Sequence, residues 1–130
     1  MSDLNAGDAV PELRETPDKY LPHRYAGASG DFNPIHIDDE FAKAVGLPRN
    51  ILHGLYSMGL VARANTALAG GDPRALKRLS VQFRGMGMPE QEIVVTGTVS
   101  SADGNRVTIA TEATQGDNKI IKNAEAEIEL

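Results

Sequence analysis

The residues best suited to acid–base chemistry lie close together in the segment SGDFNPIHIDDE, residues 29–40. Asp31, Asn33 and His36 fall within six positions of one another, around Pro34. A carboxylate and an imidazole that face the same small volume can hold a water molecule and exchange protons with it. Such a pair is suited to proton transfer, and the amide of Asn33 can orient a neighbour or fix a turn.

Pro34 determines how these side chains can meet. On a continuous helix, residues five positions apart would point about 140° away from each other. Pro34 lacks an N–H and pushes Asn33 out of the α region, so the chain must turn between Asp31 and His36. We therefore expect a turn that brings the carboxylate and the imidazole to one site. Two simpler interpretations compete with this one, in which Asp31 only caps an Asn-Pro turn and His36 is a loop or packing histidine.

A second stretch, ILHGLYSMGL at residues 51–60, places Gly54 at the expected start of an apolar helix. A backbone N–H at a helix N-terminus can stabilise negative charge that develops on a substrate oxygen, such as that of an enolate. Glycine at that position lets a substrate approach closely. His53 is interpreted as a polar residue near the helix start. A metal site that combines His36 and His53 with a nearby acid matches no known ligand spacing, so no metal is expected.

The first half of the chain is expected to be helical and irregular. Thr16 and Pro17 are suited to the start of a helix, which Pro22 should kink or interrupt. A short helix is expected over residues 38–45, closed by a glycine and a proline. Residues 54–70 have helical length and are apolar on nearly every side, which is typical of a buried helix.

After residue 74 the hydrophobic period changes from 3.6 to 2. Apolar and polar residues alternate in four segments, with hairpin signals at residues 103–105 and 116–118. A short strand is expected near residues 9–14. The order indicates an α+β domain over residues 1–130, in which an antiparallel sheet of about five strands wraps around a long central helix.

Composition narrows the functions further. The 130 residues are 41% hydrophobic and 24% charged, without cysteine, so disulfides and thiolate metal sites play no part. A net charge of −5 argues against nucleic-acid binding. The start of the chain does not read as a signal peptide, and no apolar stretch approaches the roughly 20 residues that span a bilayer. We therefore expect no membrane partner and a cytoplasmic location.

Two segments, YAGASGDFNPIH at residues 25–36 and LHGLYSMG at residues 52–59, together resemble the MaoC-like, R-specific enoyl thioester hydratases. The resemblance extends over nearly the whole chain and implies the hot-dog fold. It implies that Asp31 and His36 form a catalytic dyad supported by Asn33, and that the N–H of Gly54 polarises the thioester carbonyl. The implied reaction is reversible syn hydration of trans-2-enoyl thioesters to R-3-hydroxyacyl thioesters. No cofactor is implied, because coenzyme A or phosphopantetheine is part of the substrate.

Substrate-binding residues are expected around the same helix start. Leu55, Tyr56 and Met58 are candidates for the acyl pocket and equally for the core. Ser57 matches a serine that some family members place near the aspartate. Arg84 is one of several candidates for contacting the phosphate of coenzyme A or an acyl carrier protein.

Three assemblies or activities remain open from the sequence. The first is a homodimeric hydratase or dehydratase, because family members are usually dimers with the cleft at the subunit interface. The second is one subunit of a heterodimer, inactive without another hot-dog chain. The third is a hot-dog thioesterase, which usually carries a catalytic carboxylate on the central helix. Residues 54–69 contain no Asp or Glu, which counts strongly against the thioesterase.

Overall fold

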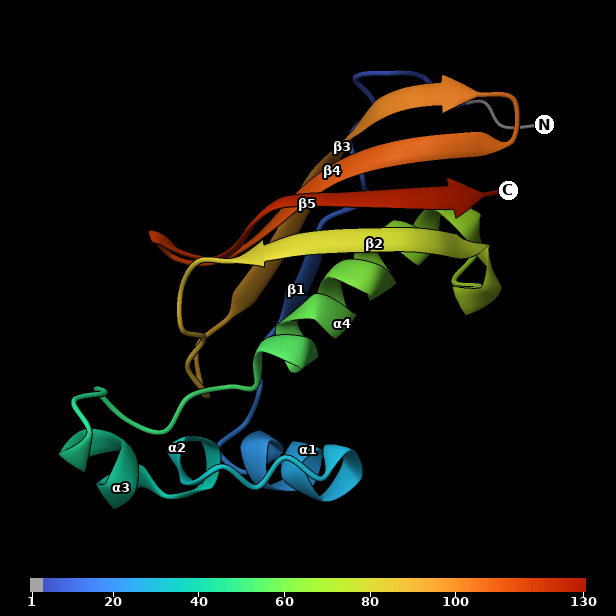
Figure 1. Ribbon diagram of the computed structural model, residues 1–130. Coiled ribbons are helices and arrows are strands. Elements are labelled where there is room, and N and C mark those ends of the chain that lie inside the picture. Colours follow the sequence, from blue (N-terminus) through green and yellow to red (C-terminus); the bar gives the residue numbers. More distant parts are fainter. Residues whose placement is uncertain (1–3) are drawn as a thin grey trace.

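The computed structural model describes residues 4–130, and the order of its elements explains how the site is positioned (Figure 1). Apart from one short first strand, helices come first and strands follow. The elements are β1 (Leu13–Glu15), α1 (Leu21–Ser29), α2 (Pro34–Ile37), α3 (Asp39–Ala44), α4 (Gly54–Thr66), the 3-10 turns η1 (Ala67–Ala69) and η2 (Pro73–Ala75), β2 (Leu76–Phe83), β3 (Ile93–Asp103), β4 (Arg106–Gln115) and β5 (Asn118–Glu129).

The strands form one five-stranded sheet in the order β1-β3-β4-β5-β2, and its neighbouring strands pair antiparallel. Helix α4 packs against one face of this sheet and contacts β2, β3, β4 and β5 (Figure 1). The predicted sheet around a central helix is therefore confirmed, and the arrangement is the hot-dog fold.

The alternating sequence pattern accounts for the sheet. Residues of one parity face α4, so that Ile93, Val95 and Val99 on β3 are at most 1% exposed. The predicted hairpins form with Gly104 at φ 60° and Gly116 at φ 57°, a backbone conformation that glycine adopts without strain. The predicted first strand is shorter than expected, because the segment contributes a single bridge at Ala9 before β1 begins at Leu13.

Helix α1 starts later than the sequence predicts. Tyr20 is its N-cap and Pro22 lies in its first turn, where a missing N–H removes no helical hydrogen bond. The expectation that Pro22 interrupts a helix begun near Thr16 is therefore wrong. The helix ends at Gly30, which adopts φ 80° and donates its N–H to the carbonyl of Ala26 at 2.8 Å. This reversal directs the chain into the segment that contains Asp31.

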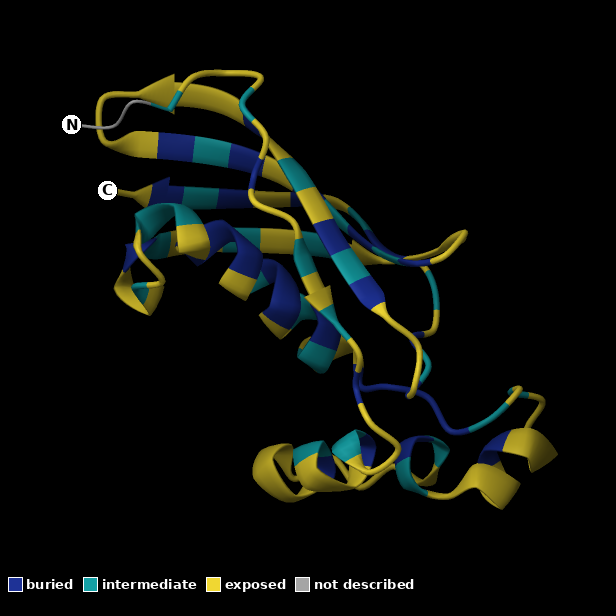
Figure 2. Ribbon diagram, turned by 180° about the vertical axis from the view of Figure 1, so that it is seen from behind, coloured by how far each residue is buried: buried dark blue, intermediate teal, exposed yellow. Residues whose placement is uncertain are grey.

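Helix α4 is buried along one side only. Leu60, Val61 and Ala64 are at most 3% exposed and pack against the sheet. The opposite side, which includes Leu55 and Gly59, is exposed (Figure 2). The expectation of a helix buried on nearly all sides is therefore wrong for this chain taken alone, because the sheet covers one face and α1, α2 and α3 lie beyond the helix end.

Those three helices form a separate layer near the N-terminal end of α4 (Figure 1). The segment between α3 and α4 is bonded on one side to α2 and on the other to the loop between β2 and β3, by two backbone hydrogen bonds. Ile51 donates its N–H to the carbonyl of Ile35 at 3.0 Å, and Leu52 donates to Gly87 at 2.8 Å. The start of α4 is thereby fixed against α2. Within residues 4–130, no helix combines the length and apolar character needed to cross a bilayer.

Candidate active site

Asp31 lies in a turn that its own side chain helps to close. Its Oδ1 atom accepts the N–H of Asn33 at 3.2 Å, and its N–H donates to Oγ of Ser29 at 3.2 Å. The simpler interpretation, that Asp31 caps the Asn-Pro turn, is therefore confirmed for one carboxylate oxygen. The other oxygen, Oδ2, takes no part in the turn and faces His36.

His36 belongs to α2, which Asn33 and Pro34 begin. Oδ1 of Asn33 accepts the N–H of Ile35 at 3.2 Å, and Pro34 occupies the first turn. Pro34 therefore separates α1 from α2 and turns the chain, as predicted. Asn33 thus positions His36 indirectly, as the N-cap of the short helix that carries it.

The His36 ring is oriented so that one nitrogen faces Asp31. Its Nδ1 lies 2.9 Å from the carbonyl of Ile51, which can only accept, so Nδ1 carries a proton and, in the neutral ring, the lone pair is on Nε2. Nε2 lies 3.7 Å from Oδ2 of Asp31. The Asp31 side chain is 52% exposed and that of His36 is 10% exposed. The predicted proximity of carboxylate and imidazole is confirmed. The imidazole is buried and held by the carbonyl of Ile51, whereas the carboxylate is open to solvent.

Asn50 supports the backbone of His36 and does not line the cleft described below. It is 5% exposed and donates its side-chain N–H to the carbonyl of His36 at 2.9 Å. Its own backbone N–H donates to Oδ1 of Asp39 at 3.0 Å. The hydrogen bond from Lys43, followed by that from Asn50, lowers the pKa of the Asp39 carboxyl. Sequence reasoning missed Asn50, because nothing near it in the sequence marks a partner 14 residues away.

His53 was also missed as part of the site. Its Nε2 donates to the backbone carbonyl of Asp31 at 3.0 Å, and its ring stacks on that of His36 with 3.9 Å between centroids and 22° between planes. It precedes α4 as predicted, but it is 2% exposed and its ring takes part in the site. The His-Gly pair within the family motif was the available signal.

Gly54 is the first residue of α4, and His53 provides no side-chain cap there. Among the described residues, the N–H of Gly54 has no acceptor. A Cβ at this position would lie 3.1 Å from Cε1 of Phe83, so the ring of Phe83 covers the glycine closely. The helix start therefore combines a free N–H with the positive end of the helix dipole and a narrow approach.

A cleft of about 280 Å³ brings together Asp31, His53 and Gly54, whereas His36 is not among its lining residues and reaches the site only through its contact with Asp31. Its lining residues are Tyr25, Ser29, Asp31, His53, Gly54, Leu55 and Phe83. The carboxylate and the helix-start N–H thus share one cavity, with two apolar side chains beside them. This arrangement can hold a polar reacting group against Asp31 and Gly54 and an apolar group against Leu55 and Phe83.

The structure separates the residues predicted to bind substrate. Leu55 lines the cleft, whereas Tyr56 and Met58 pack against the core. Ser57 is 1% exposed and its Oγ has no hydrogen-bond partner within residues 4–130. Arg84 lies outside the cleft lining and donates to Oε1 of Gln82 at 2.7 Å. The binding role predicted for Tyr56, Met58 and Arg84 therefore finds no support in this cleft.

Asp31, His36 and His53 offer ligand atoms within 4.8 Å of one another, which raises the question of a metal. The nitrogens that donate to carbonyls are not available, leaving Nε2 of His36 and Nδ1 of His53. The two rings stack with 22° between their planes and 3.9 Å between their centroids, so the two lone pairs lie in separate, nearly parallel planes. They do not converge on one ion at about 2.0–2.1 Å. The geometry favours proton transfer over metal binding.

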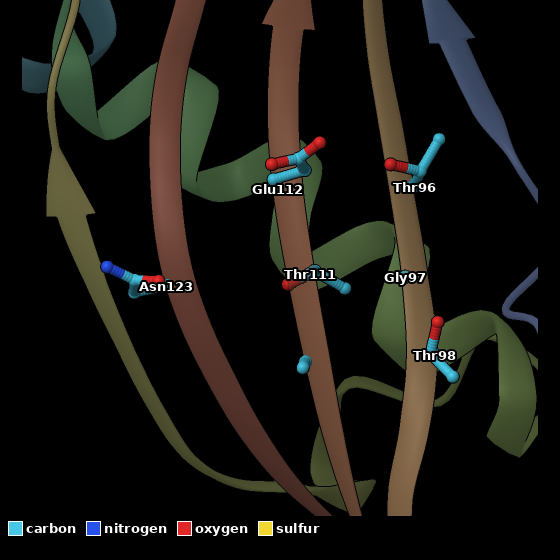
Figure 3. A pocket seen from close by; sticks show the side chains of 7 residues that line it. Thr96, Gly97, Thr98, Thr111, Glu112 and Asn123 are labelled. Carbon is cyan, nitrogen blue, oxygen red and sulfur yellow. The ribbon is translucent and has the colours of Figure 1, made fainter. Parts of the chain in front are cut away.

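A larger hollow of about 350 Å³ lies on the face of the sheet that α4 does not cover (Figure 3). It is lined by Thr96, Gly97, Thr98, Ala110, Thr111, Glu112 and Asn123. Glu112 is the one titratable residue in this lining, and it is 3.4 Å from the Nζ of Lys119. Size alone would favour this hollow, but it has no acid–base pair, so the cleft at α4 is the better candidate.

The fold and the site define a hot-dog domain with a carboxylate–imidazole pair at the start of its central helix. Residues 9–122 match the MaoC like domain family, and the chain belongs to that family. Among curated proteins, the peroxisomal enoyl-CoA hydratase 2 of Arabidopsis thaliana is 35% identical over 113 residues, which are 86% of this chain and 35% of the relative.

Solved structures agree with this assignment. A MaoC-like dehydratase superposes with a TM-score of 0.92 and 31% identity over 98% of this chain and 41% of its own. The unliganded R-hydratase PhaJ1 of Pseudomonas aeruginosa gives a TM-score of 0.82 with 25% identity over 98% of this chain and 82% of its own. This chain thus spans 35% of the plant relative and 41% of the first structure, but most of the second.

Proposed function

We propose that the chain catalyses the reversible syn hydration of trans-2-enoyl thioesters to R-3-hydroxyacyl thioesters. The observation that carries the proposal is the pair of Oδ2 of Asp31 and Nε2 of His36, 3.7 Å apart, beside the cleft that contains Gly54. Family membership supports it, as do the plant relative named as an enoyl-CoA hydratase and the bacterial structure named as an R-hydratase.

The dyad is suited to activating water. A water molecule in the cleft can lie about 2.8 Å from both Oδ2 and Nε2, because the two atoms are 3.7 Å apart. The carboxylate of Asp31 accepts a hydrogen bond from one O–H of this water and orients it, and that O–H becomes the hydroxyl of the product. Nε2 of His36 takes the other proton as the water oxygen bonds to C3 of the substrate. The electron pair of the C2–C3 double bond then moves toward the thioester carbonyl.

Gly54 and the dyad complete the addition. The N–H of Gly54 donates a hydrogen bond to the thioester oxygen as negative charge develops on it, in a cleft where such a donor is worth far more than in water. As the enolate collapses, the proton held by His36 returns through the dyad to C2. Because both proton-transfer groups lie on one side of the substrate, hydroxyl and hydrogen add to the same face. The substrate brings its own carrier, coenzyme A or phosphopantetheine, and the reaction requires no further cofactor.

Hydration of crotonyl-CoA, followed as loss of the enoyl ultraviolet absorbance, tests this proposal. Chiral analysis of the 3-hydroxy product should give the R form, and the reverse reaction should regenerate the absorbance. Free thiol is measured in parallel, since its release would indicate a thioesterase. Absence of both hydration and dehydration across short, medium and long acyl chains, on either carrier, would contradict the proposal.

A second candidate is a chain that is active only when another hot-dog chain completes the cleft. The exposed side of α4 and the sheet-edge position of β2 favour assembly with a further domain. The first two compared proteins are also more than twice as long as this chain, which leaves room for a second domain in each. A homodimer is the simplest assembly, and a heterodimer the alternative.

Oligomeric state and activity together separate these two. A dimer of the purified chain that hydrates crotonyl-CoA supports the homodimer. An inactive chain that becomes active when a second hot-dog chain is added supports the heterodimer. The cytoplasmic location stays a prediction, and the plant relative is named as peroxisomal.

A further inference from the structure

We infer that His53 is a positioning residue that ties the acid–base pair to the oxyanion donor, an inference that rests on the proposed function. His53 contacts both members of the dyad and precedes Gly54 in the chain. Its burial, at 2% exposure, makes these contacts a fixed part of the site.

The first contact fixes the backbone of Asp31. Nε2 of His53 donates to the carbonyl of Asp31 at 3.0 Å, across 22 residues of sequence. The other hydrogen bonds around Asp31 come from its own exposed turn, at Ser29 and Asn33. Because the Asp31 side chain is 52% exposed, few neighbours restrain the carboxylate directly. Its position depends on the backbone, and His53 provides the one long-range anchor of that backbone among the hydrogen bonds of the described residues.

The second contact restrains the ring of His36. The two imidazole rings stack at 3.9 Å, while Ile51 holds the Nδ1 edge of His36 at 2.9 Å. The ring of His53 also contacts the ring of Tyr25, with 4.7 Å between the two centroids. A ring held on its edge and on one face has little freedom to rotate, so Nε2 stays directed toward Asp31.

The third link is covalent. The peptide bond between His53 and Gly54 carries the N–H that is proposed to donate to the oxyanion. The carbonyl of His53 accepts the N–H of Tyr56 at 3.1 Å within the first helical turn. His53 is the N-cap, with φ −65° and ψ 135°. One rigid residue therefore sets the separation between the dyad and the oxyanion donor. A displacement of about 1 Å between such groups can cost about 100-fold in rate.

Two substitutions separate positioning from simple packing. His53→Phe keeps a flat ring for stacking but removes the donor to Asp31. His53→Gln removes the ring but keeps an N–H donor at the ε position. We expect kcat to fall about 100-fold in His53→Phe, with KM within about threefold, and to recover to within about tenfold of wild type in His53→Gln. The free energy of unfolding in urea is measured for both variants. If His53 served only packing, the loss of kcat would follow the loss of stability and not the presence of the N–H donor.

Two kinetic outcomes would overturn the inference: wild-type kcat in His53→Phe, or a kcat in His53→Gln no better than in His53→Phe. Nitrogen-15 NMR of the imidazoles in the wild-type protein gives a readout that needs neither a folded variant nor activity. We expect Nε2 of His53 to carry a proton, and a neutral ring with its proton on Nδ1 and none on Nε2 would refute the contact with Asp31. If the wild-type protein were inactive on every thioester, the proposed function would be contradicted. The tautomer of His53 would still show whether its Nε2 donates to the carbonyl of Asp31.

Discussion

Replacing Gly54 with proline should remove one N–H from the site and leave the helix intact. Gly54 is the first residue of α4, where proline is well tolerated because that N–H has no helical acceptor. His53 precedes it with φ −65° and ψ 135°, and this ψ lies in the extended range that a residue before proline prefers. The substitution therefore tests the oxyanion donor rather than the fold.

Gly54→Ala is the matched control, because it keeps the N–H and adds only a Cβ. That Cβ would lie 3.1 Å from Cε1 and 3.3 Å from Cδ1 of Phe83. Phe83 is 51% exposed, so its ring has room to shift by a few tenths of an ångström. Because alanine also restricts the unfolded chain, stability should be unchanged or higher by about 0.4–1 kcal/mol. The narrower approach should raise KM more than it lowers kcat.

The difference between the two variants isolates the N–H. Loss of one oxyanion donor costs about 10²–10³ in kcat, which corresponds to about 2.7–4 kcal/mol. Steady-state hydration of crotonyl-CoA at saturating substrate should thus show Gly54→Pro at least about 100-fold below Gly54→Ala, with both folded by circular dichroism. Equal kcat values in the two folded variants would refute the role of this N–H.

The remaining predictions concern the cleft wall, the support of the imidazole and the response to acid. Phe83→Ala should widen the cleft and raise kcat/KM for long acyl chains relative to crotonyl-CoA, measured across a chain-length series. Asn50→Ala leaves the buried carbonyl of His36 without its side-chain donor, so urea unfolding should show a loss of about 1–3 kcal/mol together with a lower kcat. The pKa of Asp39 is lowered from 3.8 by Lys43 and Asn50, so its stabilising effect is present above that value and is lost as the pH falls through the lower, folded-state pKa. On acidification below about pH 4, the melting temperature of Asp39→Asn should therefore fall less than that of wild type.

Each of these has a clear contrary result. An unchanged chain-length profile in Phe83→Ala would place the acyl chain elsewhere. Unchanged stability in Asn50→Ala would mean that its bond to His36 contributes little. Parallel acid melting curves for Asp39→Asn and wild type would assign the acid sensitivity to other carboxylates.

Much of the fold follows from local patterns in the sequence. The change of hydrophobic period after residue 74 predicts the strands, and the positive φ at Gly104 and Gly116 explains why those residues mark the hairpins. The meeting of Asp31 and His36 was also predictable, because Pro34 forces a turn over a short distance where few other conformations are open.

The features that were missed depend on contacts between distant residues. His53 is 22 residues from the carbonyl it binds, and Asn50 is 14 residues from the one it supports. A polar residue before a helix has the same local pattern whether it faces solvent or a buried carbonyl. The exposed side of α4 was missed for a similar reason, since an apolar helix surface does not reveal how much of it one sheet can cover.

The most direct test of the central claim is the hydration rate of Asp31→Asn. The asparagine keeps an oxygen that can accept the N–H of Asn33, so the turn should remain while the charged acceptor facing His36 is lost. We predict a fall in kcat of about 10²–10⁴ with crotonyl-CoA, and an unfolding midpoint close to that of wild type. A folded Asp31→Asn variant with wild-type kcat would contradict the account and leave the segment around Pro34 as a turn without a catalytic role.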